Sequence, residues 1–128
     1  MRVALILVGL SIAPAGFCQK ADCDTVEKCH EILKTNRSDS LAHFRLGEMH
    51  FKDRNFQSSA NEFREALNGN LSPKWTEVWA FVNLGKIFDI TGQRERALNE
   101  YRMAKRTGDN TRGAQDEVAK YLEGPYKE

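Results

Sequence analysis

The stretch VWAFVNLGKIFDITGQRERALNEYRMAK, residues 78–105, repeats an earlier stretch of the same chain, SLAHFRLGEMHFKDRNFQSSANEFREAL, residues 40–67. The two align without a gap at an offset of 38 residues, and seven of the 28 aligned positions are identical. One identity pairs Gly47 with Gly85, and most of the others fall at helical spacing. Self-similarity at a fixed period indicates an internal duplication of a helical unit.

A glycine lies in the middle of a predicted helix in each copy. Gly85 stands among Val82, Leu84 and Phe88, which are spaced like the buried face of a helix. A mid-helix glycine costs about 1 kcal/mol relative to alanine, so we expect it to meet a packing need. We predict that Gly85 and its counterpart Gly47 let the backbones of two helices approach closely.

Both copies predict a pair of helices joined by a short turn. The first copy predicts helices over 40–52 and 56–68. The second copy predicts helices over 73–90 and 94–107, with Ser72 as the cap of the first and a glycine after the last. Each copy is therefore interpreted as one helical hairpin.

Apolar stripes at helical spacing also flank the two copies. Before them, residues 24–36 predict a helix that begins with a capping box of Asp24 and Glu27. After them, a helix is predicted over 110–123, ended by Gly124, with the polar outer face that the last helix of a stack needs. The fold class is therefore predicted to be all-α.

The repeated residues resemble the tetratricopeptide repeat, in which leucine, glycine, aromatic and alanine positions recur at fixed spacings. The resemblance is carried by Leu46, Gly47, Phe63, Ala66, Phe81, Leu84, Gly85, Phe88, Ala97, Tyr101 and Ala104. It implies a short α-solenoid of about six antiparallel helices within residues 20–128. Its parts would be a half repeat, two full repeats at about 40–73 and 74–109, and a capping helix at about 110–123.

The first 19 residues have the layout of a secretory signal peptide. A short basic start precedes an apolar run over 3–12, which is too short to span a membrane, and small residues follow it. We expect cleavage after Ala15 or near Gln19, which leaves an exported chain, periplasmic or secreted, with no integral membrane span. A lipid on Cys18 is disfavoured because no small residue precedes it.

The cysteines leave two interpretations open. Cys23 and Cys29 form a disulfide only if Cys23 precedes the helix, because six helical residues would separate their Cα atoms by about 9 Å. An exported chain permits such a bond, and the pattern does not decide whether it forms. With His30, the same cysteines offer an alternative from another class, a redox or covalent-haem protein, although their spacing exceeds the usual two intervening residues.

Composition and motifs favour neither nucleic-acid binding nor catalysis. The net charge is +1, and no segment gathers the lysines and arginines that phosphate binding needs. No phosphate loop, nucleophile triad or metal motif of recognised spacing is present, so we predict no enzyme activity, cofactor or metal. His43 and His50 are interpreted as packing residues and not as metal ligands.

We therefore predict an adaptor or scaffold that binds a peptide or a partner protein on the concave face of the stack. The resemblance implies that this face presents Leu41, Phe44, Arg45, Glu48, Lys52, Trp79, Val82, Asn83, Lys86 and Ile90. Trp75 and Trp79 either add an exposed aromatic patch to the interface or cover the end of their helix. A further alternative is a structural subunit of an envelope assembly.

Overall fold

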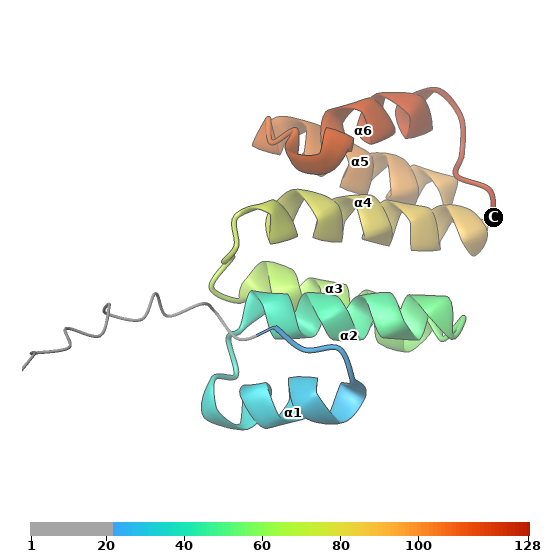
Figure 1. Cartoon of the computed structure of the whole chain (residues 1–128). Coiled ribbons are helices and arrows are strands. Elements are labelled where there is room, and N and C mark those ends of the chain that lie inside the picture. Colours follow the sequence, from blue (N-terminus) through green and yellow to red (C-terminus); the bar gives the residue numbers. More distant parts are fainter. Residues whose placement is uncertain (1–21) are drawn as a thin grey trace, which may run out of the picture.

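The structure is a computed structural model that describes residues 22–128. This part of the chain forms six α-helices and one 3₁₀ helix and contains no strand, which confirms the all-α prediction there. The elements are α1 (Val26–Thr35), α2 (Ser40–Lys52), α3 (Phe56–Asn68), α4 (Trp75–Ile90), α5 (Arg94–Thr107), η1 (Thr111–Gly113) and α6 (Ala114–Glu123) (Figure 1). The predicted signal peptide, with Cys18, lies outside the described residues.

The helices are arranged in two layers. In Figure 1, α2, α4 and α6 lie one above another, and α3 and α5 lie behind them. α2 packs mainly on α3, and α4 packs mainly on α5, so each copy of the repeated sequence forms one hairpin. Contacts of α3 with α4 and of α5 with α6 join the hairpins into a single stack, and α1 covers α2 at the other end.

Three of the four repeat helices, α2, α3 and α5, span the residues that the sequence predicts. The fourth prediction is wrong at its start, because α4 begins at Trp75 instead of Pro73 and Ser72 is not its cap. The loop before α4 is tied to the start of α2, where the N–H of Leu71 donates to Oγ of Ser40 at 2.8 Å. This contact fixes the loop before α4 to the start of α2.

Helix α1 begins two residues later than predicted, and its N-cap is Thr25 instead of Asp24. Oγ1 of Thr25 accepts a hydrogen bond from the N–H of Lys28 at 3.2 Å, whereas the Asp24 carboxylate pairs with the Lys28 ammonium. Cys23 therefore stands before the helix, and its sulfur is bonded to that of Cys29. The disulfide that the sequence left open is present in the structure.

The last predicted helix is divided in two. Residues 110–123 form the 3₁₀ helix η1 followed by α6, because Arg112 and Gly113 have positive φ angles of 56° and 74° between them. An α-helix cannot pass through two left-handed residues. The prediction of one continuous capping helix is thus wrong, and Arg112 lies at a bend.

The turns of the two hairpins have the same backbone geometry. The N–H of Asn55 donates to the carbonyl of His50 at 2.8 Å, and the N–H of Gln93 donates to that of Phe88 at 2.7 Å. These four residues are equivalent at the offset of 38. The residue before each donor has a positive φ, 59° in the first turn and 74° in the second. The duplication read from the sequence therefore extends to the hydrogen bonds of the backbone.

The repeated glycines make room for aromatic rings. A Cβ atom on Gly85 would lie 2.3 Å from Cε1 of Tyr101, and one on Gly47 would lie 2.8 Å from Cε1 of Phe63. Both distances are well below the roughly 3.5 Å at which carbon atoms pack. The predicted close approach is present, but its partner is a ring of the second helix and not the backbone of that helix.

Most residues of the repeat signature belong to the core. Ten of the eleven are buried, and the exception, Phe81, is partly exposed. The main cluster is formed by residues of α2 to α6. A smaller cluster under α1 contains Cys29 and Leu46, so the disulfide lies against the N-terminal end of the stack.

Candidate functional site

A cavity of about 350 Å³ opens between α2, α4 and η1. Five of its six lining residues belong to the predicted concave face, and the sixth comes from η1. The lining residues are Phe44, Glu48, Trp79, Asn83, Lys86 and Arg112. The helical residues meet here because positions three and four apart share one face of a helix.

Three residues predicted for the concave face are buried, and of these only Phe44 lines the cavity. Leu41, Phe44 and Val82 are 4%, 2% and 0% exposed, so a partner reaches little of their side chains. α2 contacts α1, α3 and α4, which leaves only a narrow strip of its surface free. Lys52 and Ile90 lie at the C-terminal ends of their helices and do not line this cavity.

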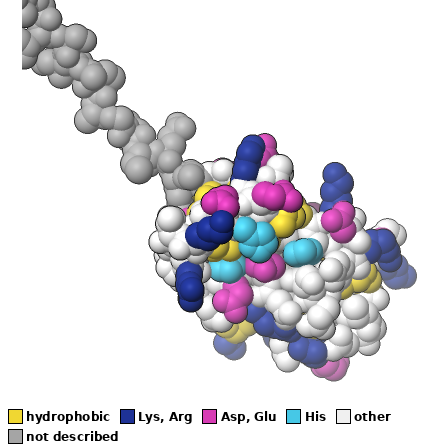
Figure 2. Space-filling model, turned by 90° about the horizontal axis from the view of Figure 1, so that it is seen from below, with side chains coloured by type: hydrophobic (Ala, Val, Ile, Leu, Met, Phe, Trp, Pro, Cys, Tyr) yellow, Lys and Arg dark blue, Asp and Glu magenta, His cyan; other side chains and the backbone are white. Residues whose placement is uncertain are grey.

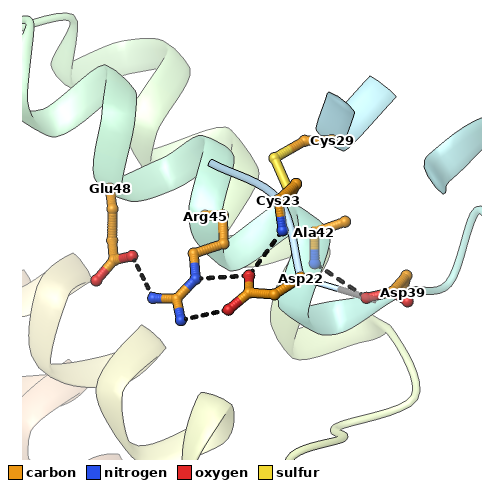
Figure 3. A network of polar contacts seen from close by, with 7 residues as sticks. All are labelled: Asp22, Cys23, Cys29, Asp39, Ala42, Arg45 and Glu48. Carbon is orange, nitrogen blue, oxygen red and sulfur yellow. Dashed lines mark hydrogen bonds and ion pairs between the residues drawn. A yellow bond between two sulfur atoms is a disulfide. The ribbon is translucent and has the colours of Figure 1, made fainter. Parts of the chain in front are cut away.

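Arg45 borders a second cavity, of about 550 Å³, between α2 and the segment before α1. Its Nε and Nη2 each donate to one carboxylate oxygen of Asp22 at 2.9 Å, and its Nη1 donates to Glu48 at 2.8 Å (Figure 3). The hydrogen bond from Arg45 lowers the pKa of Asp22 below its usual value. Since Glu48 lines both cavities, we treat them as neighbouring parts of one trough.

The two tryptophans pack and also keep an accessible edge, since both are partly buried. The indole of Trp75 contacts two guanidiniums, with Cζ of Arg112 4.4 Å and Cζ of Arg45 5.6 Å from its ring centroid. Nε1 of Trp79 donates to the carbonyl of Thr111 at 3.0 Å. These contacts fit the interpretation that each ring covers neighbouring elements, and the use of the two rings in an interface stays a prediction.

The side chain of Lys86, on α4, faces α6. Its Nζ lies 3.6 Å from a carboxylate oxygen of Glu117, and 5.9 Å and 5.1 Å from the ring centroids of Trp79 and Tyr126. Burial lowers the pKa of the Lys86 ammonium, and the carboxylate of Glu117 opposes that shift. The charge of Lys86 is thus already balanced within the chain.

Asn83 and Arg112 have polar groups without a partner. Within residues 22–128, the carboxamide of Asn83 forms no hydrogen bond, and the guanidinium of Arg112 forms no hydrogen bond or ion pair. A carboxamide offers both a donor and an acceptor, and a guanidinium offers five donors. The cavity is therefore lined by hydrogen-bonding groups that the described chain leaves unused.

Sequence reasoning missed Arg112, Asp22 and the role of Trp75 beside Arg45. Arg112 follows the second copy, where the period ends, and its position depends on the bend before α6. Asp22 contacts Arg45, and the residue that follows Asp22 is bonded to α1 through the disulfide. The cluster Arg-Gly at 112–113, just before an apolar stripe, was the one available signal of a bend.

The other candidate chemistry lies at α1 and α2. The sulfurs of Cys23 and Cys29 are bonded at 2.06 Å and both residues are buried, whereas thioether attachment of haem needs two free thiols. In the described part of the chain, no three His, Cys, Asp or Glu side chains are placed to hold a metal ion. His43 bonds to Glu62 at 2.7 Å and to the carbonyl of Arg37 at 3.0 Å.

The end of the stack near α1 carries mixed charge. Figure 2 shows acidic, basic and histidine side chains interspersed on this face, with hydrophobic side chains between them.

Among the helices of residues 22–128, none combines the length and the apolar character needed to cross a membrane.

Comparison with known proteins gives no match. No family model, no curated protein and no solved structure matches this chain. The resemblance to the tetratricopeptide repeat therefore depends on the residues and the geometry described above.

Proposed function

We propose that this chain is an exported, non-catalytic interaction module of the tetratricopeptide type, which binds an extended peptide of a partner protein along α2, α4 and η1. The observation that carries the proposal is the carboxamide of Asn83, unpaired within the described residues, in a cavity of about 350 Å³. It lies one turn from both Trp79 and Lys86 on α4.

The repeat type is supported by equivalent features in both hairpins. The turn hydrogen bonds recur at the offset of 38, and each repeated glycine faces an aromatic ring of the second helix. Two such hairpins with a further helix at each end fit a short α-solenoid, whose inner helices line one face.

A peptide ligand is favoured by the chemistry of the cavity. The Asn83 carboxamide can accept from a ligand's backbone N–H and donate to its carbonyl, which recognises an extended chain independently of its sequence. The partly buried ring of Trp79 supplies apolar contact area beside these polar groups. The cavity thus combines a backbone-binding group with a surface for one side chain.

Export is supported by the predicted signal peptide and by the disulfide. Cys23 and Cys29 are bonded in a small cluster beneath α1, which suits a compartment where disulfides persist.

Site-specific crosslinking tests the proposal. A photo-crosslinking amino acid would replace Glu48, at the rim of the cavity, in the full chain produced by its own cells; a control carries it at Arg102, exposed on α5. We expect a discrete crosslinked protein from position 48 only, lost on Asn83→Ala and kept on Asn99→Ala. Equal products from both positions, or none from position 48, would overturn the proposed groove.

A further inference from the structure

We propose that the outer face of the C-terminal half of α5 docks this protein on a lipid bilayer with anionic headgroups. This α5 basic face consists of Arg102, Met103, Lys105 and Arg106, all of them exposed. α5 lies in the rear layer of Figure 1, and no residue of α5 lines the trough. Docking through α5 therefore goes beyond the proposed function and does not depend on it.

Charge is distributed unevenly among the α-helices of residues 22–128. α5 contains five basic residues and two acidic ones. In none of the other helices do Arg and Lys outnumber Asp and Glu by more than one. The net charge of +1 for the whole chain conceals this asymmetry. Positive charge is thus concentrated on one helix, where it attracts anionic surfaces.

The two acids of α5 lie away from the α5 basic face. Glu95 belongs to the first turn of the helix. Glu100 is partly buried, and burial raises the pKa of its carboxyl while the charges of Arg64 and Arg96 oppose that shift. The last part of the helix, residues 102–107, contains no acid. Along the sequence the acids interleave with the bases, and only the folded helix separates them.

The three cations of the α5 basic face have no ionic partner within residues 22–128. Arg102 donates to a carboxamide oxygen at 3.2 Å and Arg106 donates to the sulfur of Met103 at 3.8 Å, so both contact neutral groups. Asp109, the acid that follows α5, accepts instead from the N–H of Thr111 at 2.8 Å and from its hydroxyl at 2.6 Å. Anionic headgroups therefore meet cations that no carboxylate of the described chain contacts.

Met103 gives the α5 basic face an apolar element. It is the large hydrophobic side chain that is exposed among the described residues, at 40%. Its sulfur contacts the guanidinium of Arg106, one turn further along the helix. At a bilayer surface the methionine can enter the apolar layer while the long basic side chains reach the phosphates. Nucleic acid offers phosphates without such a layer, so a bilayer fits this face better.

The expected binding is weak and reversible. Each Lys or Arg near an anionic bilayer strengthens binding about fivefold, so the three cations together contribute on the order of a hundredfold. Lys105 and Arg106 also complement the C-terminal end of the helix dipole, whereas Arg102 lies before the last turn. Stability of the helix alone therefore does not account for all three.

Co-sedimentation with vesicles tests the inference. The full mature chain, without the predicted signal peptide, is mixed with vesicles made of phosphatidylglycerol and phosphatidylcholine in equal parts. Vesicles of phosphatidylcholine alone are the uncharged control. We expect binding to the mixed vesicles only, and we expect it to fall as NaCl is added. Equal binding to both kinds of vesicle, or binding to neither, would overturn the inference.

Variants assign the binding to the α5 basic face. We expect Arg102→Gln and Arg106→Gln each to weaken binding to the mixed vesicles about fivefold, and Met103→Ser to weaken it about threefold. The matched control is Arg37→Gln, which removes an exposed cation between α1 and α2 and should change binding far less. Melting curves check that each variant folds. Equal losses with Arg37→Gln and Arg102→Gln would contradict the inference.

Two other anions test whether the ligand is a bilayer. Inorganic phosphate, at an ionic strength matched with NaCl, should release no more protein from the mixed vesicles than NaCl does. A short DNA duplex should bind more weakly than the mixed vesicles. Greater release by phosphate would indicate a site for the free anion, and tighter binding of DNA would indicate a nucleic-acid surface. Either result would refute docking on a bilayer.

Discussion

The two hairpins share a turn geometry but close it with different side chains. In the first, Phe51 and Phe56 meet edge to face, with ring centroids 5.6 Å apart. At the equivalent positions of the second stand Asp89, whose side chain is fully buried, and Arg94, which donates to both of its oxygens at 3.1 Å. The two turns share one backbone geometry, which is stabilised by dispersion between rings in the first turn and by an ion pair in the second.

The polar closure also reaches the next elements of the chain. Asp89 accepts hydrogen bonds from the Tyr101 hydroxyl at 2.8 Å and from the N–H of Tyr126 at 2.9 Å, and Arg94 donates to the carbonyl of Tyr121 at 2.7 Å. Burial and the bond to Asp89 raise the pKa of the Tyr101 phenol. The comparison teaches that the second turn holds α6 and the segment after it through a buried carboxylate, whereas the first turn reaches that segment only through the exposed ion pair of Arg54 with Glu128.

We expect the removal of Asp89 to have the largest effect on stability among the changes that test the difference between the two turns. Asp89→Ala leaves the guanidinium of Arg94 and the hydroxyl of Tyr101 without their buried acceptor, and we expect it to lower the free energy of unfolding by about 3–5 kcal/mol. Urea denaturation measures the effect. A double-mutant cycle of Asp89 with Arg94 should give a larger coupling energy than one of Phe51 with Phe56, which we expect near 1 kcal/mol. Equal couplings would contradict the distinction.

The two repeated glycines differ in how closely an added Cβ atom would approach the ring that faces it. A Cβ on Gly85 would lie 2.3 Å from the ring of Tyr101, closer than the 2.8 Å between one on Gly47 and Phe63. We expect Gly85→Ala to destabilise by about 2–3 kcal/mol through overpacking, and Gly47→Ala by about 1 kcal/mol. Thermal melting of both variants, with the exposed Lys105→Ala as control, checks this. The expectation fails if Gly47→Ala proves the more damaging substitution.

We expect a smaller effect on stability at the residue of each turn that has a positive φ. Arg54 holds it in the first turn, with φ of 59°, and Gly92 in the second, with φ of 74°. Because glycine adopts this conformation without steric cost, Gly92→Arg should destabilise by about 0.5–1 kcal/mol, and Arg54→Gly should stabilise by at most about 0.5 kcal/mol, since it also removes the exposed ion pair with Glu128 and the contact with Phe56. Urea midpoints measure both. Two shifts of the same sign would show that the turns are not equivalent.

The smallest expected effect depends on pH and on His43, which stands where the second copy has Phe81. Burial opposes protonation of His43, but its bonds to Glu62 and to the Arg37 carbonyl raise its pKa above the usual value. Both partners accept, so only the doubly protonated ring satisfies both. Its stabilisation is complete below the unfolded pKa of about 6.5 and is lost as pH rises through the raised folded pKa.

Urea midpoints from pH 5.5 to 8.5 test this expectation. The native chain should lose stability towards the alkaline end, and His43→Phe, which copies the second hairpin, should lose less. A His43→Phe variant with the same pH dependence as the native chain would exclude His43 as the cause.

The accuracy of the predictions made from the sequence differs from helix to helix. The boundaries of α2, α3 and α5 follow from apolar periodicity and local stop signals, and the buried repeat residues follow from the same pattern. The start of α4 does not, because the loop before it is tied to Ser40, which is distant in sequence. The start of α1 depends on a local choice between two adjacent capping residues, and the structure uses Thr25 instead of Asp24. The ring that fills the space over Gly85 is likewise invisible to periodicity.

The candidate site shows the same division. The resemblance placed Glu48, Trp79, Asn83 and Lys86 on one face of the stack, and they line one cavity. The resemblance also assigned Leu41 and Val82 to that surface, but both are buried, because α2 contacts three other helices and α4 contacts four.

By itself the sequence determined the duplication, the all-helical class and the helix faces, because these depend on local periodicity and on turn residues. Only the tertiary structure decided how the hairpins are closed, that Cys23 is bonded to Cys29, and that Asp22 and Arg112 converge near Trp75. These contacts join residues whose separation along the chain follows no period. They arise from the packing of whole elements, which no local pattern encodes.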